Sequence, residues 1–185
     1  MPKITKIVTL KVMRDKIWHQ MFQAKHAEIY LRYYLDRKKE IKNRLNVSIL
    51  FTTVVGAAGW KIELLPVISC LLATILVFID RYGKEFVLTD EQLKTFSELK
   101  SKNIQYCSRL EEMYDKLDRN LITENEALSE FYIARKIYEE IENMDDTANV
   151  FTNRKLVEKS RTETLEYFNN YHKLNNNEQA RNAEN

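Results

Sequence analysis

Two uncharged runs stand out in the alternation of apolar and polar positions along the chain. Residues 45–60 and residues 64–79 each contain no charged side chain over 16 positions, and Lys61 and Glu63 lie between them. As a helix, each run spans about 24 Å, somewhat less than the roughly 30 Å hydrocarbon core of a bilayer. Neither run has the charged face that a helix of a soluble bundle normally shows. The pattern predicts a two-span transmembrane hairpin with spans at about 45–60 and 64–81, and a hairpin buried inside a soluble bundle is the alternative.

The two predicted spans differ in apolar strength. The second run holds eleven Leu, Ile, Val or Phe residues and the first only seven, because hydroxyl-bearing and small residues dilute the first. Four of these diluting residues share one face of a helix: Ser48, Thr52, Gly56 and Gly59. Small residues let membrane helices approach closely, whereas hydroxyls on one face can line a pore formed by several hairpins. Both interpretations, a helix seam and a pore lining, stay open at this point.

Basic residues flank the hairpin on one side of the predicted membrane. A short basic cluster precedes the first span, Arg81 follows the second, and the tip between the spans offers only Lys61. Because cytoplasmic flanks carry the excess of Lys and Arg, both termini are expected in the cytoplasm and the tip outside. A cluster this short and this close to a span favours lipid over direct nucleic-acid binding. The candidate contacts to lipid headgroups are Lys38, Lys39, Lys42, Arg44 and Arg81.

Helical periodicity extends to both sides of the hairpin. Residues 17–44 contain no Gly or Pro and place apolar side chains on one face, which predicts a basic cytoplasmic helix continuous with the first span. Downstream, residues 83–173 predict an acidic cytoplasmic region of three helices. Capping-box patterns at Thr89–Gln92 and Thr123–Glu126 open two of these helices.

The two ends of the chain are less regular. Residues 1–16 alternate apolar and polar positions in part, which is compatible with a short strand that would lack a partner. Residues 174–185 are polar, rich in Asn, and expected to be disordered. The fold class predicted from the whole pattern is an all-α membrane protein. It consists of the transmembrane hairpin at 45–82 and a cytoplasmic helical bundle formed by the pre-hairpin helix and the C-terminal helices.

Charge is distributed unevenly along a chain of 185 residues whose net charge is only +2. Residues 1–44 carry twelve Lys or Arg and four Asp or Glu, whereas residues 80–185 carry sixteen Lys or Arg and 22 Asp or Glu. Packing of the acidic helices against the basic helix accounts for this asymmetry without a ligand.

The residue types that carry catalysis are sparse and scattered. The three histidines and two cysteines, His19, His26, His172, Cys70 and Cys107, show no metal-ligand or nucleophile–base spacing. Only three glycines are present, so a glycine-rich phosphate loop has no place in the chain. The sequence predicts a protein that is not an enzyme and has no cofactor or metal.

The order of segments resembles one known family. An aromatic and basic helix, "WHQMFQAKHAEIYLRYYLDRKKEIKNRL", precedes a Ser-containing span, "NVSILFTTVVGAAGW". A second span, "LLPVISCLLATILVFIDRYGK", then leads into long polar helices. Over roughly residues 15–170 this architecture is similar to the SLATT domain, a bacterial two-transmembrane effector module.

The resemblance implies a function that the residues alone do not. SLATT proteins are thought to perturb membranes or form pores in anti-phage and related conflict systems. They are typically encoded beside nucleotide-signal synthases, nucleotide sensors or reverse transcriptases. By this resemblance the chain would be a homo-oligomeric effector that permeabilises the bacterial inner membrane on activation and causes growth arrest or death. The alternative is a passive membrane anchor or scaffold that recruits a partner through its cytoplasmic helices.

Overall fold

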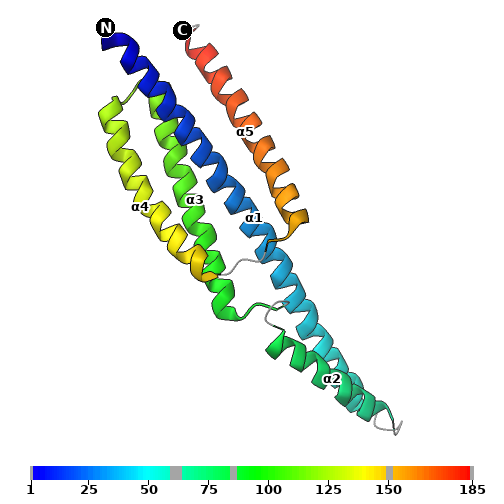
Figure 1. Cartoon of the computed structure of the whole chain (residues 1–185). Coiled ribbons are helices and arrows are strands. Elements are labelled where there is room, and N and C mark those ends of the chain that lie inside the picture. The colour runs from blue at the N-terminus through cyan, green and yellow to red at the C-terminus, as the bar shows by residue number, and fades with distance from the viewer. Residues whose placement is uncertain (1, 59–63, 84–86, 149–151, 184–185) are drawn as a thin grey trace. The chain divides into compact units, whose positions relative to one another are not determined.

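The computed structural model of the chain is helical (Figure 1). It describes residues 2–58, 64–83, 87–148 and 152–183, and over these residues it contains five helices and no strand. The helices are α1 (Pro2–Ala58), α2 (Leu65–Tyr82), α3 (Asp90–Asp118), α4 (Glu124–Ala148) and α5 (Arg154–Ala183). They form two compact units, one of Met1–Tyr33 with Phe96–Asn185 and one of Tyr34–Thr95. The prediction of an all-helical chain containing a helical bundle is thus confirmed.

Helix α1 is one continuous element of 57 residues, roughly 86 Å long. The predicted continuity between residues 17–44 and the first apolar run is therefore present. The strand considered for residues 1–16 is wrong, because the helix already begins at Pro2. A helix satisfies its backbone hydrogen bonds internally, whereas a lone strand leaves them unpaired. Proline also suits a first helical turn, where its missing N–H costs nothing.

Two capping boxes begin α3 and α4 as the sequence predicted. The Gln92 N–H donates to Thr89 Oγ1 at 3.2 Å, and the Thr89 N–H donates to Gln92 Oε1 at 3.0 Å. At α4 the Glu126 N–H donates to Thr123 Oγ1 at 3.4 Å, and the Thr123 N–H donates to Glu126 Oε2 at 2.7 Å. The backbone N–H of Thr123, followed by its hydroxyl, lowers the pKa of the Glu126 carboxyl. Each box satisfies two N–H groups that a helix start otherwise leaves unpaired.

The first unit is a bundle with an apolar core contributed by α1, α3, α4 and α5. Its most deeply buried apolar side chains are Ile17, Met21, Leu99, Leu110, Met113 and Leu117. From α5, Phe168 adds an aromatic cluster, with its ring 4.8 Å from Trp18 and 5.7 Å from Phe22. The turn between α3 and α4 places Asn120 at φ 54°, a left-handed conformation that asparagine tolerates well. Ion pairs between α1 and the acidic helices, Arg14 with Asp118 and Arg32 with Glu163, join the oppositely charged segments.

Helix α5 continues beyond the point at which the sequence predicted it to end. The disorder expected for residues 174–185 is not seen as far as Ala183, where α5 ends. The segment holds helix formers such as Leu, Glu, Gln, Ala and Arg between its asparagines. Extending an anchored helix avoids the nucleation cost that an isolated segment of this length faces.

The second unit contains the end of α1 and the whole of α2, which run alongside each other as a hairpin (Figure 1). Helix α2 begins next to Pro66 and ends at Tyr82, close to the predicted bounds. Gly83 then donates its N–H to the Ile79 carbonyl at 2.8 Å, and a Cβ at this position would lie 2.4 Å from that oxygen. A residue with a side chain does not fit there, so Gly83 defines the end of α2. Across the described residues, none of the helices combines the length with the apolar character that a full crossing of a bilayer requires.

Candidate functional site

The hairpin of α1 and α2 exposes a broad apolar face on each of its two helices. Phe51 on α1 is 69% exposed and Leu71 on α2 is 61% exposed. In the second unit the exposed large apolar residues are Val47, Leu50, Phe51, Val54, Leu64, Val67, Ile68, Leu71, Leu72, Ile75, Val77, Phe78 and Ile79. On α2 they recur mostly at spacings of three and four residues and share one broad face, with Val77 on another. Such a surface needs an apolar environment to cover it.

The two hairpin helices approach each other closely at Gly56. A Cβ built there would lie 2.8 Å from Ser69 Cβ, and Ser69 is buried. Glycine therefore permits a helix contact that alanine would obstruct. Of the predicted stripe, Gly56 lies in the seam, while Gly59 is outside the described residues.

The remaining stripe residues have their hydroxyls bonded within α1. Ser48 Oγ donates to the Arg44 carbonyl at 2.8 Å, and Thr52 Oγ1 donates to the Ser48 carbonyl at 2.6 Å. Thr53, on another face, bonds the Ile49 carbonyl in the same way at 2.8 Å. Ser48 is exposed and Thr52 is half-buried. These hydroxyls need no water or partner, which suits a helix surrounded by hydrocarbon.

The residues predicted to contact lipid headgroups lie next to the apolar parts of α1 and α2. Lys42 forms an ion pair with Asp90 at 2.6 Å, and Arg44 forms one with Glu40 at 2.5 Å. The Lys38 ammonium lies 5.4 Å from the centre of the Tyr34 ring, and Lys39 is exposed. Arg81 stands in the last turn of α2. The structure brings Lys39 and Lys42 to one shallow surface depression with Asn43 and Asn46.

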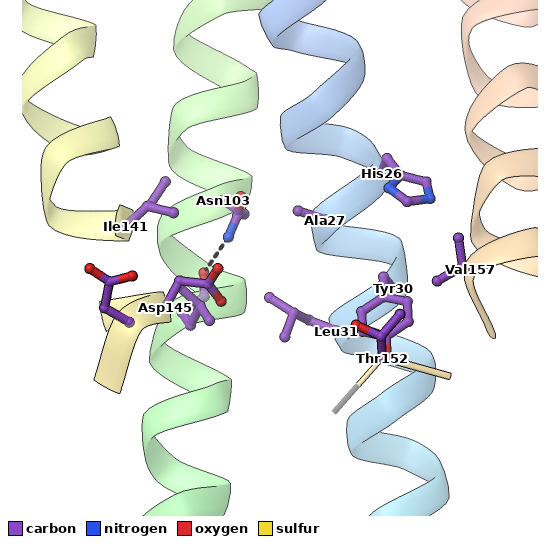
Figure 2. Close-up of a pocket in the computed structure, with 11 residues that line it drawn as sticks. His26, Ala27, Tyr30, Leu31, Asn103, Ile141, Asp145, Thr152 and Val157 are labelled. Carbon is purple, nitrogen blue, oxygen red and sulfur yellow. Dashed lines mark hydrogen bonds between the residues drawn. The ribbon is translucent and has the colours of Figure 1, made fainter. Parts of the chain in front are cut away.

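A cavity of about 530 Å³ opens between α1, α3, α4 and α5 in the first unit. Figure 2 shows its walls, with His26 and Tyr30 on α1, Asn103 on α3 and Asp145 on α4. Tyr30 accepts the Asn153 backbone N–H through its hydroxyl at 3.1 Å. None of the described residues that line the cavity is Lys or Arg. A phosphate-bearing nucleotide would therefore meet carboxylates there without any cation to hold it.

A serine and a histidine meet at the wall of this cavity, but not as a catalytic pair. Ser160 Oγ lies 3.0 Å from His26 Nε2 and donates its single proton to the Val157 carbonyl at 2.9 Å. The serine therefore accepts from His26 and cannot pass its proton to it. Ser160 is fully buried, so a substrate could not reach its oxygen. The pair joins α1 to α5 and stabilises their packing. The other described histidine of α1, His19, bonds Gln23 at 3.0 Å and does not meet His26.

Polar contacts hold α5 against its neighbours. Tyr167 donates to Glu111 Oε1 at 2.7 Å and Tyr171 donates to Asp115 Oδ1 at 3.0 Å, and burial followed by these carboxylates raises the pKa of both phenols. Tyr33 and Arg32 on α1 both donate to the Glu163 carboxylate, and Arg32 is the larger cause of the lowered pKa of that carboxyl. These contacts, together with Phe168, fix the position of α5.

The two cysteines lie in different surroundings. Cys107 is buried in the bundle core, and burial, followed by the nearby Glu111, raises the pKa of its thiol. Cys70 is exposed on α2. A raised pKa keeps Cys107 a thiol, which is neither a nucleophile nor a good metal ligand. The described residues form no group of three or more His, Cys, Asp or Glu side chains that would hold a metal ion.

The cavity was not foreseen from the sequence, because its walls come from four helices distant along the chain. Asn103 and the pair Asp145 and Asp146 show no motif, and only the assembled bundle brings them together.

Comparison with known proteins assigns the chain to no family: no family model, no curated protein and no solved structure matches it.

Proposed function

We propose that the chain is a non-enzymatic membrane effector whose hairpin inserts into the bacterial inner membrane. On activation, copies of the chain would assemble and permeabilise that membrane, causing growth arrest or death. The observation that carries the proposal is the exposed apolar surface of the hairpin, with thirteen large apolar side chains between Val47 and Ile79. At about 1 kcal/mol for each half-exposed side chain, covering them is favourable by on the order of 10 kcal/mol. That is as large as the whole stability of a typical domain.

The internal chemistry of the hairpin supports a lipid environment over a soluble partner. The hydroxyls of Ser48, Thr52, Thr53 and Thr74 bond carbonyls four residues earlier in their own helices, that of Thr74 with Cys70 at 2.8 Å. Helix α2 has 18 residues, roughly 27 Å, which is slightly shorter than a bilayer core. Short spans adjust by thinning the bilayer or by associating with each other. Both responses favour a protein that perturbs a membrane.

The effector role, as distinct from membrane attachment, rests on the SLATT resemblance. Basic residues of α1 precede its apolar part, and Arg81 lies in the last turn of α2. Their positions support an orientation with both termini in the cytoplasm. In this orientation the bundle meets cytoplasmic partners, which the resemblance suggests are nucleotide-signal synthases, nucleotide sensors or reverse transcriptases encoded nearby. No described residue of the cavity lining is Lys or Arg, so we propose that such a signal arrives through a partner protein.

Membrane insertion is tested by fractionation of a hairpin variant and a matched bundle variant. Leu71→Lys places a charge at a 61% exposed hairpin position, and Leu121→Lys places one at a 70% exposed bundle position. A lysine near the centre of a span costs about 2.5–3.5 kcal/mol, whereas one in water costs little. We expect the wild type and Leu121→Lys to stay in the membrane pellet after carbonate washing and Leu71→Lys to be depleted from it. Release of the wild-type chain by carbonate would contradict the proposal.

Permeabilisation is tested by a membrane-potential dye after induced expression with the neighbouring genes. The alternative function, a passive scaffold, predicts unaltered polarisation and normal growth. The double change Ser48→Leu with Thr52→Leu removes the hydroxyl stripe, and Thr53→Leu with Thr74→Leu removes two hydroxyls elsewhere on the hairpin as a control. A pore lined by the stripe loses conductance only in the first variant, whereas a scaffold tolerates both.

A further inference from the structure

A surface of the bundle, within the first unit, has the features of a ligand site. The 530 Å³ cavity adjoins another of about 200 Å³, and the two share Ala27, Asn103, Ile141 and Asp145 in their walls. Together they form one groove along α1, α3 and α4. Its combined volume falls within the range of small-molecule sites in proteins. Both cavities belong to the first unit, so the groove is independent of the hairpin.

Three carboxylates of α4 line this groove, and no described Lys or Arg does. They are Glu142, Asp145 and Asp146, spaced three and four residues apart on one helical face. Asp145 and Asp146 follow Glu142 by three and four residues, a spacing at which Cβ atoms lie about 5–6 Å apart. Neither Asp145 nor Asp146 forms an ion pair or hydrogen bond with a residue that the structure describes. The three carboxylates concentrate negative charge along one side of the groove, which favours a cationic ligand there.

The floor of the groove contains a buried amide with unused bonding capacity. Asn103 is 4% exposed and lines both cavities. Its Nδ2 donates to the Leu99 carbonyl at 2.9 Å, whereas no described residue donates to its Oδ1. This oxygen is not among the described buried side-chain atoms that lack a partner, so it is accessible to a donor that enters the groove. Figure 2 shows Asn103 between Ile141 and Ala27, at the centre of the walls.

The rest of the lining combines apolar and aromatic side chains with the polar residues Gln20, Gln23, His26 and Thr152. Ala27, Leu31 and Ile141 offer surfaces for methylene groups, while Tyr30 and Tyr138 offer ring faces for a cation. The carboxylate of Glu142 beside Tyr138 is the first cause of the raised pKa of that phenol, which keeps the ring neutral. A compact hydrated metal ion would use none of these surfaces. A flexible chain with amines separated by a few methylenes would use all of them.

We propose that this groove binds a linear organic polycation of the polyamine class. Its ammonium groups pair with Asp145, Asp146 and Glu142, its methylenes lie over the apolar floor, and one N–H donates to Asn103 Oδ1. Charge-assisted hydrogen bonds supply most of the affinity. Because α1, α3 and α4 all contribute, the bound ligand stabilises the bundle by mass action.

The test is calorimetric titration of the purified full chain with spermidine at fixed ionic strength. Asp145→Asn with Asp146→Asn removes two negative charges from the groove. Glu139→Gln with Glu140→Gln removes two from positions of the same helix that line neither cavity, where these residues form exposed pairs with Arg135 and Lys102. We expect saturable binding by the wild type, weakening of about tenfold or more in the aspartate variant, and a change below about twofold in the glutamate variant. Thermal unfolding without ligand shows that each variant is folded.

A third variant separates a built site from attraction by net charge. Asn103→Leu keeps the net charge and replaces the amide with an apolar group of similar size, so it should weaken spermidine about fivefold if Oδ1 accepts a hydrogen bond. Absence of saturable binding by the wild type overturns the proposal. So does equal weakening in the two charge variants, an unchanged affinity in Asn103→Leu, or displacement of spermidine by magnesium chloride at matched ionic strength.

Discussion

The contact between Gly56 and Ser69 makes a quantitative prediction for the hairpin seam. Gly56→Ala adds a Cβ at 2.8 Å from Ser69 Cβ, well inside the usual 3.5–4.0 Å separation of carbon atoms. Overpacking of this kind costs about 1–3 kcal/mol. Alanine also gains about 1 kcal/mol over glycine inside a helix, so the single variant should lose about 0–2 kcal/mol.

The double variant isolates the contact from the helix propensities. Ser69→Gly removes the Cβ that the new alanine meets, so in this background Gly56→Ala should stabilise the hairpin by about 1 kcal/mol. The coupling between the two changes is then about 1–3 kcal/mol, since propensity cancels around the cycle. Thr53→Ala, at an exposed position on the same helix, should add to Ser69→Gly within about 0.5 kcal/mol.

The assay is hydrogen exchange of the α1 and α2 amides in detergent micelles, read by mass spectrometry as local opening free energies. It reports on the hairpin alone, which unfolding of the whole chain would not. A coupling no larger than that of the Thr53 control refutes the reasoning. Gly56 would then not face Ser69, and the small residues of α1 would be free to line a pore.

Three further predictions concern the bundle. Thr123→Ala removes the capping hydroxyl of α4 and should lower the free energy of unfolding by about 1 kcal/mol in chemical denaturation. Phe168→Ala should cost about 3–5 kcal/mol in the same assay, because its ring is buried, whereas Leu165→Ala at an exposed α5 position should cost less than about 0.5 kcal/mol. The pKa of Glu163 is lowered in the folded state, so its contribution to the free energy of unfolding is present above the unfolded-state pKa and is lost as the pH falls through the folded-state pKa. Glu163→Gln should therefore flatten the acid side of the plot of stability against pH. An unchanged plot would contradict the pairing of Glu163 with Arg32.

The elements that local signals specify were predictable from the sequence. The capping boxes at Thr89 and Thr123 depend on side chains three residues apart, and the hairpin depends on composition and Pro66. The ends of the chain were not predictable in this way. Their helical state depends on continuation from segments already anchored in the bundle, which periodicity within the end segments does not show.

The predicted stripe on α1 shows that a small rotation between successive steps along a helix changes which residues share a face. Steps of four residues, as from Ser48 to Thr52 to Gly56, rotate by about 40° each because a turn holds 3.6 residues. The half-buried positions among residues 45–56 of α1 are Leu45, Ile49, Thr52, Val55 and Gly56, with Ser48 turned outward. The groove in the bundle lies beyond sequence reasoning altogether, because Ala27, Asn103 and Asp145 meet only through tertiary packing.

The bonding of the hydroxyl stripe limits how a pore could form from this hairpin. Ser48 and Thr52 already donate to carbonyls of α1, and Gly56 lies against Ser69. In the closed hairpin this face therefore presents no hydroxyl proton of Ser48 or Thr52 that still needs a water acceptor. To line an aqueous pore, the hydroxyls must exchange their carbonyl acceptors for water, or α1 must turn relative to α2. Ser48→Leu with Thr52→Leu should therefore leave insertion and hairpin packing intact while reducing conductance after activation. A loss of insertion in that variant would instead mean that the stripe serves the seam, and the pore lining would have to lie on another face of the hairpin.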